Sequence, residues 1–211
     1  MKLQLALDMF DIPQSIEILK GLADVIDIVE IGTPMIIREG VHAVKKVKDA
    51  FPDLTVLADL KIMDGGGIEA ASAFDAGADI VTVLSVAENA TIKEVVKTAK
   101  KYGKQVMADM IAVRDLAARS KELDQFGLDY LCVHTAFDVQ NTGKNPLDEL
   151  KVLNSTVKNT KTAVAGGIKL STLRETAGEA PEIIVVGGGI SNQADKRAAA
   201  IEMKKIISDN K

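Results

Sequence analysis

The feature of this sequence that most constrains its fold is a strict alternation of short apolar runs with longer amphipathic stretches. Each apolar run is too short for a helix and is followed by a stretch with helical periodicity. The eight runs cover residues 3–8, 26–31, 54–61, 79–84, 105–111, 129–134, 161–165 and 182–186. Such an alternation is typical of parallel strands joined by right-handed helical crossovers.

Glycine and proline mark where most of the amphipathic stretches begin or end. The predicted helices begin near Pro13 and then cover about residues 36–50, 68–75, 91–102, 114–126, 146–158, 170–177 and 193–207. Eight strand–helix units are the number that closes a (β/α)8 TIM barrel, and the chain is near the lower length limit of that fold, roughly 200 residues. We therefore predict an α/β protein with one (β/α)8 barrel domain over residues 1–211.

An open, doubly wound sheet is the alternative architecture, and it predicts a glycine-rich phosphate turn after the first strand. The first turn here reads DMFDIP, and the glycine-rich turns follow the seventh and eighth strands instead. Loops at those two places in a barrel commonly bind phosphate, since glycine lets backbone N–H groups approach an anion. We therefore expect a phosphate site formed by Ala165, Gly166, Gly167, Gly187 and Gly188.

The composition narrows the possible functions. The net charge of −4 and the absence of a basic stripe with aromatic residues give no indication of nucleic-acid binding. A single cysteine, Cys132, excludes an internal disulfide framework and a cysteine-rich metal site. No apolar run has membrane-spanning length, and the chain enters a strand pattern without a signal-peptide pattern. We expect a soluble, cytoplasmic protein.

Polar side chains stand at the carboxyl ends of the predicted strands, where barrels carry their chemistry. The central stretch is VLADLKIMD, in which Asp59 and Lys61 point the same way on a strand and Asp64 follows in a loop. Burying a carboxylate and an ammonium group costs free energy unless the two groups pair or take part in function. Asp59 and Lys61 are therefore either a structural ion pair or part of a catalytic site. The full set at this rim is Asp8, Glu30, Asp59, Lys61, Asp109 and His134.

These residue types suggest separate roles. Glu30 and Asp59, on neighbouring strands, are oxygen donors suited to Mg2+, which usually takes only one or two protein carboxylates. His134 is the rim side chain best suited to move protons near neutral pH. Lys61 could form a Schiff base, but flanking carboxylates favour its charged, non-nucleophilic form. We interpret Cys132 as barrel filling.

Seven segments carry a resemblance to a known enzyme family. They are LQLALD (3–8), VEIGTP (29–34), VLADLKIMD (56–64), DMIAV (109–113), VHTAFD (133–138), AVAGGIK (163–169) and VVGGGI (185–190). In order, and over essentially the whole chain, they resemble the 3-hexulose-6-phosphate synthases of the orotidine 5′-monophosphate decarboxylase superfamily. The triplet of Asp59, Lys61 and Asp64 is the superfamily signature, and the sequence around it is more specific.

The resemblance implies an aldehyde-lyase that reversibly condenses D-ribulose 5-phosphate with formaldehyde, giving D-arabino-hex-3-ulose 6-phosphate through an enediolate. It implies a homodimer in which the residue matching Asp64 reaches into the neighbour's site, and Mg2+ at the positions matching Glu30 and Asp59. His134 would be the base, Lys61 would stabilise the enediolate, and Asp8 and Asp109 would orient hydroxyl groups or water.

Two other functions stay open. The related 3-keto-L-gulonate-6-phosphate decarboxylases tend to have Glu at Asp109, Thr at Ala165, Arg at Gly188 and an Arg shortly after the histidine, where this chain reads Ala136-Phe137-Asp138. All four positions favour the synthase. A non-catalytic phosphosugar-binding barrel should have lost rim charges, whereas all are present here. Gly65-Gly66-Gly67 replaces larger residues of relatives, which predicts a mobile loop after Asp64.

Overall fold

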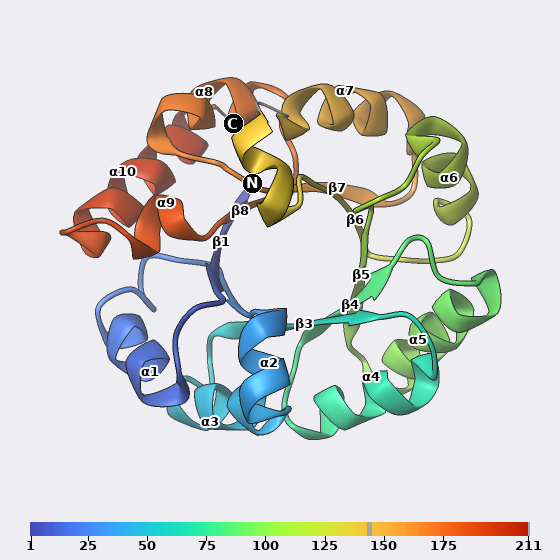
Figure 1. Ribbon diagram of the computed structural model, residues 1–211, viewed down its shortest axis with the longest axis horizontal. Coiled ribbons are helices and arrows are strands. Elements are labelled where there is room, and N and C mark those ends of the chain that lie inside the picture. Colours follow the sequence, from blue (N-terminus) through green and yellow to red (C-terminus); the bar gives the residue numbers. More distant parts are fainter. Residues whose placement is uncertain (143–144, 211) are drawn as a thin grey trace.

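The computed structural model describes residues 1–142 and 145–210. Its eight parallel strands close into one barrel in the order of the sequence, with β8 pairing β1 (Figure 1). The strands are β1 (Lys2–Leu7), β2 (Ile28–Ile31), β3 (Thr55–Ile62), β4 (Ile80–Leu84), β5 (Gln105–Asp109), β6 (Tyr130–His134), β7 (Lys161–Ala165) and β8 (Ile183–Val186). This arrangement confirms the predicted (β/α)8 barrel.

Helices surround the barrel on all sides, as Figure 1 shows. They are α1 (Ile12–Lys20), α2 (Thr33–Glu39), α3 (His42–Ala50), α4 (Gly66–Asp75), α5 (Asn89–Tyr102), α6 (Leu116–Leu123), α7 (Pro146–Thr156), α8 (Leu170–Gly178), α9 (Gly188–Ser191) and α10 (Lys196–Asp209), with a 3-10 helix, η1 (Phe137–Thr142). The start of α1 confirms the prediction at Pro13: Asp11 caps the helix by accepting from the N–H of Gln14. None of the described helices is long and apolar enough to cross a membrane.

Three helix predictions were wrong in detail. The stretch predicted as one helix over residues 36–50 is two helices, because Gly40 ends α2 with a positive φ of 66°. Helix α4 begins at Gly66, so Gly66 and Gly67 are helical and do not form the loop expected after Asp64. The backbone of Gly66 packs so closely on α5 that a Cβ would lie 2.5 Å from the carbonyl oxygen of Thr91. The glycines after β8 begin the short helix α9, where only a loop was expected.

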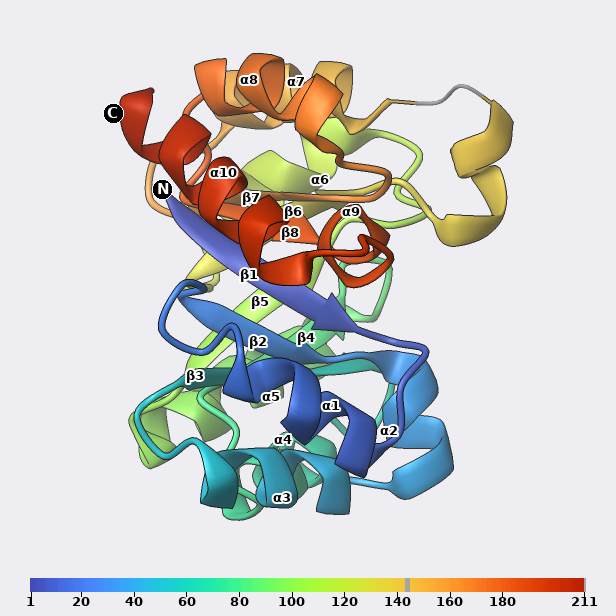
Figure 2. The same ribbon diagram turned by 90° about the vertical axis from the view of Figure 1, so that its left-hand side faces the viewer.

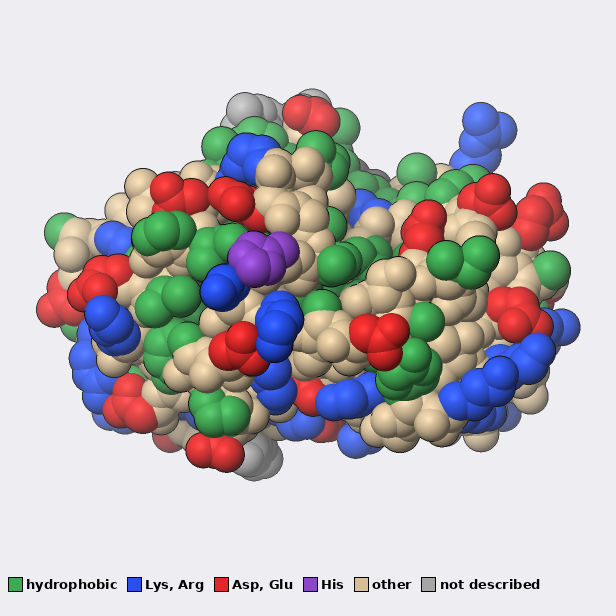
Figure 3. All heavy atoms as spheres, turned by 90° about the horizontal axis from the view of Figure 1, so that it is seen from below, with side chains coloured by type: hydrophobic (Ala, Val, Ile, Leu, Met, Phe, Trp, Pro, Cys, Tyr) green, Lys and Arg blue, Asp and Glu red, His purple; other side chains and the backbone are tan. Residues whose placement is uncertain are grey.

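Alternating strand residues divide the core into two layers. Side chains that point inward fill the barrel with aliphatic residues, Tyr130 and Cys132, whereas those that point outward pack against the helices. Burial of each large aliphatic side chain contributes roughly 1.5–3 kcal/mol. Figure 2 shows β1 running toward the side of the barrel where η1 and α9 lie. On the face of the helical layer seen in Figure 3, positive and negative side chains are interspersed.

Candidate active site

A cavity of about 870 Å³ opens at the carboxyl ends of the strands. Its size falls within the range of small-molecule sites. Asp64 does not line it. The cavity brings together all the other predicted site residues, namely Asp8, Glu30, Asp59, Lys61, Asp109, His134, Ala165, Gly166, Gly167, Gly187 and Gly188.

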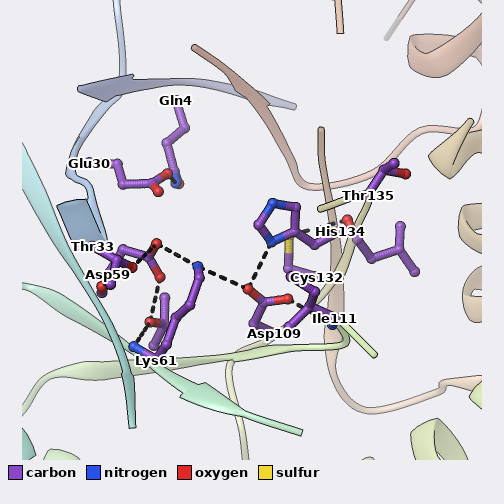
Figure 4. Close-up of polar contacts among 12 residues, drawn as sticks. Gln4, Glu30, Thr33, Asp59, Lys61, Asp109, Ile111, Cys132, His134 and Thr135 are labelled. Carbon is purple, nitrogen blue, oxygen red and sulfur yellow. Dashed lines mark hydrogen bonds and ion pairs between the residues drawn. The ribbon is translucent and has the colours of Figure 1, made fainter. Parts of the chain in front are cut away.

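Lys61 lies between two aspartates on the cavity floor (Figure 4). Its Nζ is 2.6 Å from Oδ2 of Asp59 and 3.2 Å from Oδ2 of Asp109. Burial alone would lower the pKa of Lys61, but the charges of these two carboxylates raise it above its ordinary value. The side chain therefore stays a charged ammonium, which is the state we expected and which disfavours Schiff-base chemistry.

Asp109 connects this lysine to His134. Nδ1 of His134 lies 2.8 Å from Oδ2 of Asp109, and the N–H of Ile111 donates to the other oxygen, Oδ1, at 2.9 Å. Burial alone would raise the pKa of Asp109, but hydrogen bonding to His134 and the charges of His134 and Lys61 lower it. An ionised Asp109 therefore orients the imidazole ring.

Two threonines that the sequence analysis missed hold the carboxylate of Asp59. Thr82 of β4 donates to Oδ1 at 2.7 Å, and the hydroxyl of Thr33 lies 2.8 Å from Oδ2. Thr33 begins helix α2, and Thr82 lies in a strand, where threonine is common, so residue type gave no signal. The only available signal was that Thr82, two residues after Ile80, points into the barrel.

Glu30 is a buried carboxylate of the cavity. Gln4, which the sequence analysis also missed, donates to its Oε2 at 2.6 Å. Burial first, and then the charges of Asp59 and Asp8, raise the pKa of Glu30 well above its usual range. Among the described residues, no three or more His, Cys, Asp or Glu side chains are grouped so that together they could hold a metal ion. The crowded oxygen donors of Glu30 and Asp59 nevertheless fit Mg2+, which binds through one or two carboxylates and completes its shell with other oxygens.

Asp8 lies at the end of β1 beside the backbone of Gly32. A Cβ at Gly32 would lie 2.0 Å from Oδ1 of Asp8, so a larger residue there would displace the Asp8 side chain. Burial and the charge of Asp59 raise the pKa of Asp8.

The glycines after β7 and β8 also line the cavity. Gly166 has a φ of 101°, and a Cβ there would lie 2.4 Å from the carbonyl oxygen of Thr135. This position accepts only glycine without rearrangement. The exposed Lys169 follows in the same loop and also lines the cavity. Lys169 was not among the site residues predicted from the sequence.

Asp64 lies outside the cavity and is exposed, and its Oδ1 accepts from the N–H of Gly65 at 2.7 Å.

Cys132 is buried inside the barrel as expected, and burial raises the pKa of its thiol well above the usual range. The Cys132 thiol therefore stays protonated and unreactive, and its role is structural.

The convergence of charged side chains at the carboxyl ends of a closed barrel defines a (β/α)8-barrel enzyme. The sequence model of the orotidine 5′-phosphate decarboxylase / HUMPS family matches residues 1–203. The chain belongs to this family, as the resemblance of its segments predicted.

Similar proteins refine this assignment. A 3-hexulose-6-phosphate synthase of Bacillus subtilis (strain 168) is 55% identical over 98% of this chain and 99% of its own length. The crystal structure of 3-hexulose-6-phosphate synthase from Salmonella typhimurium superimposes with a TM-score of 0.98 at 43% identity, covering 100% of both chains. These full-length similarities show an enzyme of this kind, a lyase.

A 3-keto-L-gulonate-6-phosphate decarboxylase structure from Vibrio cholerae has a TM-score of 0.87 at 23% identity and covers 99% of this chain and 97% of that one. At this identity the likeness shows the shared fold alone.

Proposed function

We propose that this protein catalyses the reversible aldol condensation of D-ribulose 5-phosphate with formaldehyde, giving D-arabino-hex-3-ulose 6-phosphate. The observation that carries the proposal is the array in which His134 and Lys61 contact the same oxygen of Asp109. A base and a fixed cation on one carboxylate are what proton removal next to a carbonyl group requires. The synthases named among the relatives support this choice of reaction.

His134 acts as the base. Because Asp109 is ionised, Nδ1 of His134 donates to it, and Nε2 keeps its lone pair for the substrate. Nε2 takes one proton from C1 of the ketose, and the electrons of the broken C–H bond move toward the C2 oxygen. The product of this step is an enediolate and a protonated imidazole.

Lys61 stabilises the negative charge of the enediolate, since its ammonium is fixed in place before the reaction. C1 of the enediolate then attacks the carbon of formaldehyde and forms the new C–C bond. The former carbonyl oxygen of formaldehyde takes the proton from His134. Atoms and charge balance, and the base is regenerated.

Glu30 and Asp59, which both line the cavity, would hold Mg2+. The ion would supply Lewis-acid polarisation of the ketose carbonyl group. Gln4 keeps Glu30 turned into the cavity by donating to Oε2.

The glycine loops after β7 and β8 bind the phosphate group through backbone N–H groups, and Lys169 adds a positive charge. Asp8 orients a substrate hydroxyl group. Because the phosphate is remote from C1, its binding energy positions the reacting carbon beside His134.

We also propose that two chains form a homodimer and that Asp64 enters the partner's cavity. Asp64 lies outside its own cavity, and it is flanked by exposed apolar side chains. Met63 is 52% exposed and Ile68 is 78% exposed, and Ile37 of α2 is 79% exposed. Burying such side chains against a second copy is favourable. We expect the dimer to act in the cytoplasm.

The test is formaldehyde consumption by purified protein supplied with ribulose 5-phosphate and Mg2+, with an EDTA control. The proposal predicts a loss of formaldehyde that requires both the sugar phosphate and the metal. No loss, together with CO2 release from 3-keto-L-gulonate 6-phosphate, would assign the chain to the decarboxylases instead. Absence of both reactions would favour a phosphosugar-binding barrel.

A further inference from the structure

The pairing of β3 with β4 is irregular at the site. Ala58 pairs Val81 and Ile62 pairs Val83, so three residues of β3 face the single residue Thr82 of β4. Two of those three, Asp59 and Lys61, carry the charges of the cavity floor. The bulge therefore places both charged groups opposite one hydroxyl group.

That hydroxyl group makes two contacts. Oγ1 of Thr82 accepts from the backbone N–H of Lys61 at 2.9 Å and donates to Oδ1 of Asp59 at 2.7 Å. A hydroxyl group has one proton and two lone pairs, so both bonds form at once. Thr82 is only 3% exposed, so water cannot readily replace it.

The backbone of Lys61 needs such a contact. Its φ is +48°, a left-handed conformation that residues with a Cβ rarely adopt. Regular strand pairing does not satisfy its N–H, because the bulge separates it from the backbone of β4. The Thr82 hydroxyl supplies the missing acceptor.

We propose that Thr82 is a positioning residue for the reaction: one hydroxyl group fixes both the backbone of Lys61 and the rotation of the Asp59 carboxylate. This inference rests on the proposed function, in which Lys61 stabilises the enediolate. Thr33 contacts Asp59 as well, but Thr82 alone among the described contacts joins Asp59 to the backbone of Lys61. Thr82 thus sets where the ammonium group lies relative to C1 of the substrate.

The test compares Thr82→Val, which keeps the shape of the side chain, with Thr82→Ser, which keeps the hydroxyl group. Thr162→Val is the matched control, because Thr162 is a buried strand threonine of β7 outside the cavity lining. Steady-state assays give kcat and the KM for ribulose 5-phosphate, thermal unfolding gives Tm, and NMR hydrogen exchange follows the Lys61 amide.

Thr82→Val should lower kcat by about tenfold to a hundredfold, the effect of a catalytic group displaced by roughly 1 Å. KM should change much less, because the phosphate loops lie on β7 and β8. Thr82→Ser should restore most of kcat, Thr162→Val should behave as wild type, and the Lys61 amide should exchange faster only in Thr82→Val. If Thr82→Val does not fold, Thr82→Cys replaces it, since a thiol is a much weaker donor and acceptor.

An unchanged kcat in a folded Thr82→Val protein, or equal losses in the Ser and Val variants, would overturn the inference. Wild-type protein that consumes no formaldehyde would instead overturn the proposed function. In that case the exchange of the Lys61 amide still decides whether Thr82 holds this backbone: equal protection in wild type and Thr82→Val refutes it.

Discussion

Nδ1 of His134 lies 2.8 Å from Oδ2 of Asp109. The negative charge of Asp109 orients the imidazole ring and favours its Nδ1–H form, and Asp109→Asn removes this charge. We predict a fall in kcat of about 10²- to 10⁴-fold, the range that a positioned base contributes, with a smaller change in the KM for ribulose 5-phosphate. The measurement is steady-state formaldehyde consumption.

The control for this variant is Asp115→Asn. Asp115 caps α6 by accepting from the N–H of Ala118, and asparagine caps a helix equally well. This variant should keep wild-type turnover. Comparable kcat values for the two variants would contradict the role of Asp109.

Lys61 and Lys48 form a matched pair for testing charge in the cavity. Lys48 pairs with Asp79 at 2.8 Å, and its side chain is 24% exposed against 25% for Lys61. Lys61→Ala should lower kcat by at least about 10²-fold while the barrel stays folded, because a fixed charge that stabilises an anionic intermediate is lost.

Lys48→Ala should leave kcat unchanged, since Lys48 does not line the cavity. The measurements are kcat and circular dichroism. Unfolding of Lys61→Ala with no loss of kcat per folded molecule would support a structural ion pair instead.

Glu30 makes the metal-free protein sensitive to pH. Because its folded pKa is raised, Glu30 contributes stability below its unfolded pKa of about 4.3, and this stability is lost as pH rises through the folded pKa. Glu30→Gln removes this loss, so its free energy of unfolding at pH 8 without metal should exceed that of wild type. The gain is about 1.4 kcal/mol for each unit by which the pKa is raised.

Urea unfolding at pH 5 and pH 8 in EDTA measures this difference. The exposed Glu69 supplies the control, since Glu69→Gln should change stability by no more than about 0.5 kcal/mol. A Glu30→Gln protein less stable than wild type at pH 8 would contradict the account. Addition of Mg2+ should stabilise wild type more than the variant.

Asp64 allows a direct test of the shared site. Lys61→Ala and Asp64→Asn proteins should each be nearly inactive. After unfolding and refolding together, random pairing should yield about one quarter of wild-type activity, because half of the dimers then hold one intact site of two. Activity no greater than the sum of the separately refolded variants would place Asp64 outside the partner's site.

Much of this fold follows from sequence pattern, because closure of a barrel depends on the number of strand–helix units and not on their detailed packing. The inward direction of Asp59 and Lys61 also followed from strand alternation. The break at Gly40 was missed because apolar periodicity continues on both sides of it. Only the positive φ of that glycine separates α2 from α3.

The parts of the site that sequence did not predict are the supporting contacts. The hydroxyl groups of Thr33 and Thr82 contact the carboxylate of Asp59, and Gln4 donates to the carboxylate of Glu30. Such contacts depend on the registers of β1 to β4 and on the bulge in β3, which no local pattern encodes. Residue type revealed the charged groups, and geometry was needed to find what holds them.

Hydrogen exchange at C1 of ribulose 5-phosphate, followed by proton NMR in D2O without formaldehyde, measures enediolate formation apart from the condensation. Wild-type protein with Mg2+ should exchange one C1 hydrogen and His134→Asn should exchange none, because the base that makes the enediolate is then missing. Exchange by His134→Asn at the wild-type rate, or no exchange by a wild-type protein that consumes formaldehyde, would contradict this mechanism.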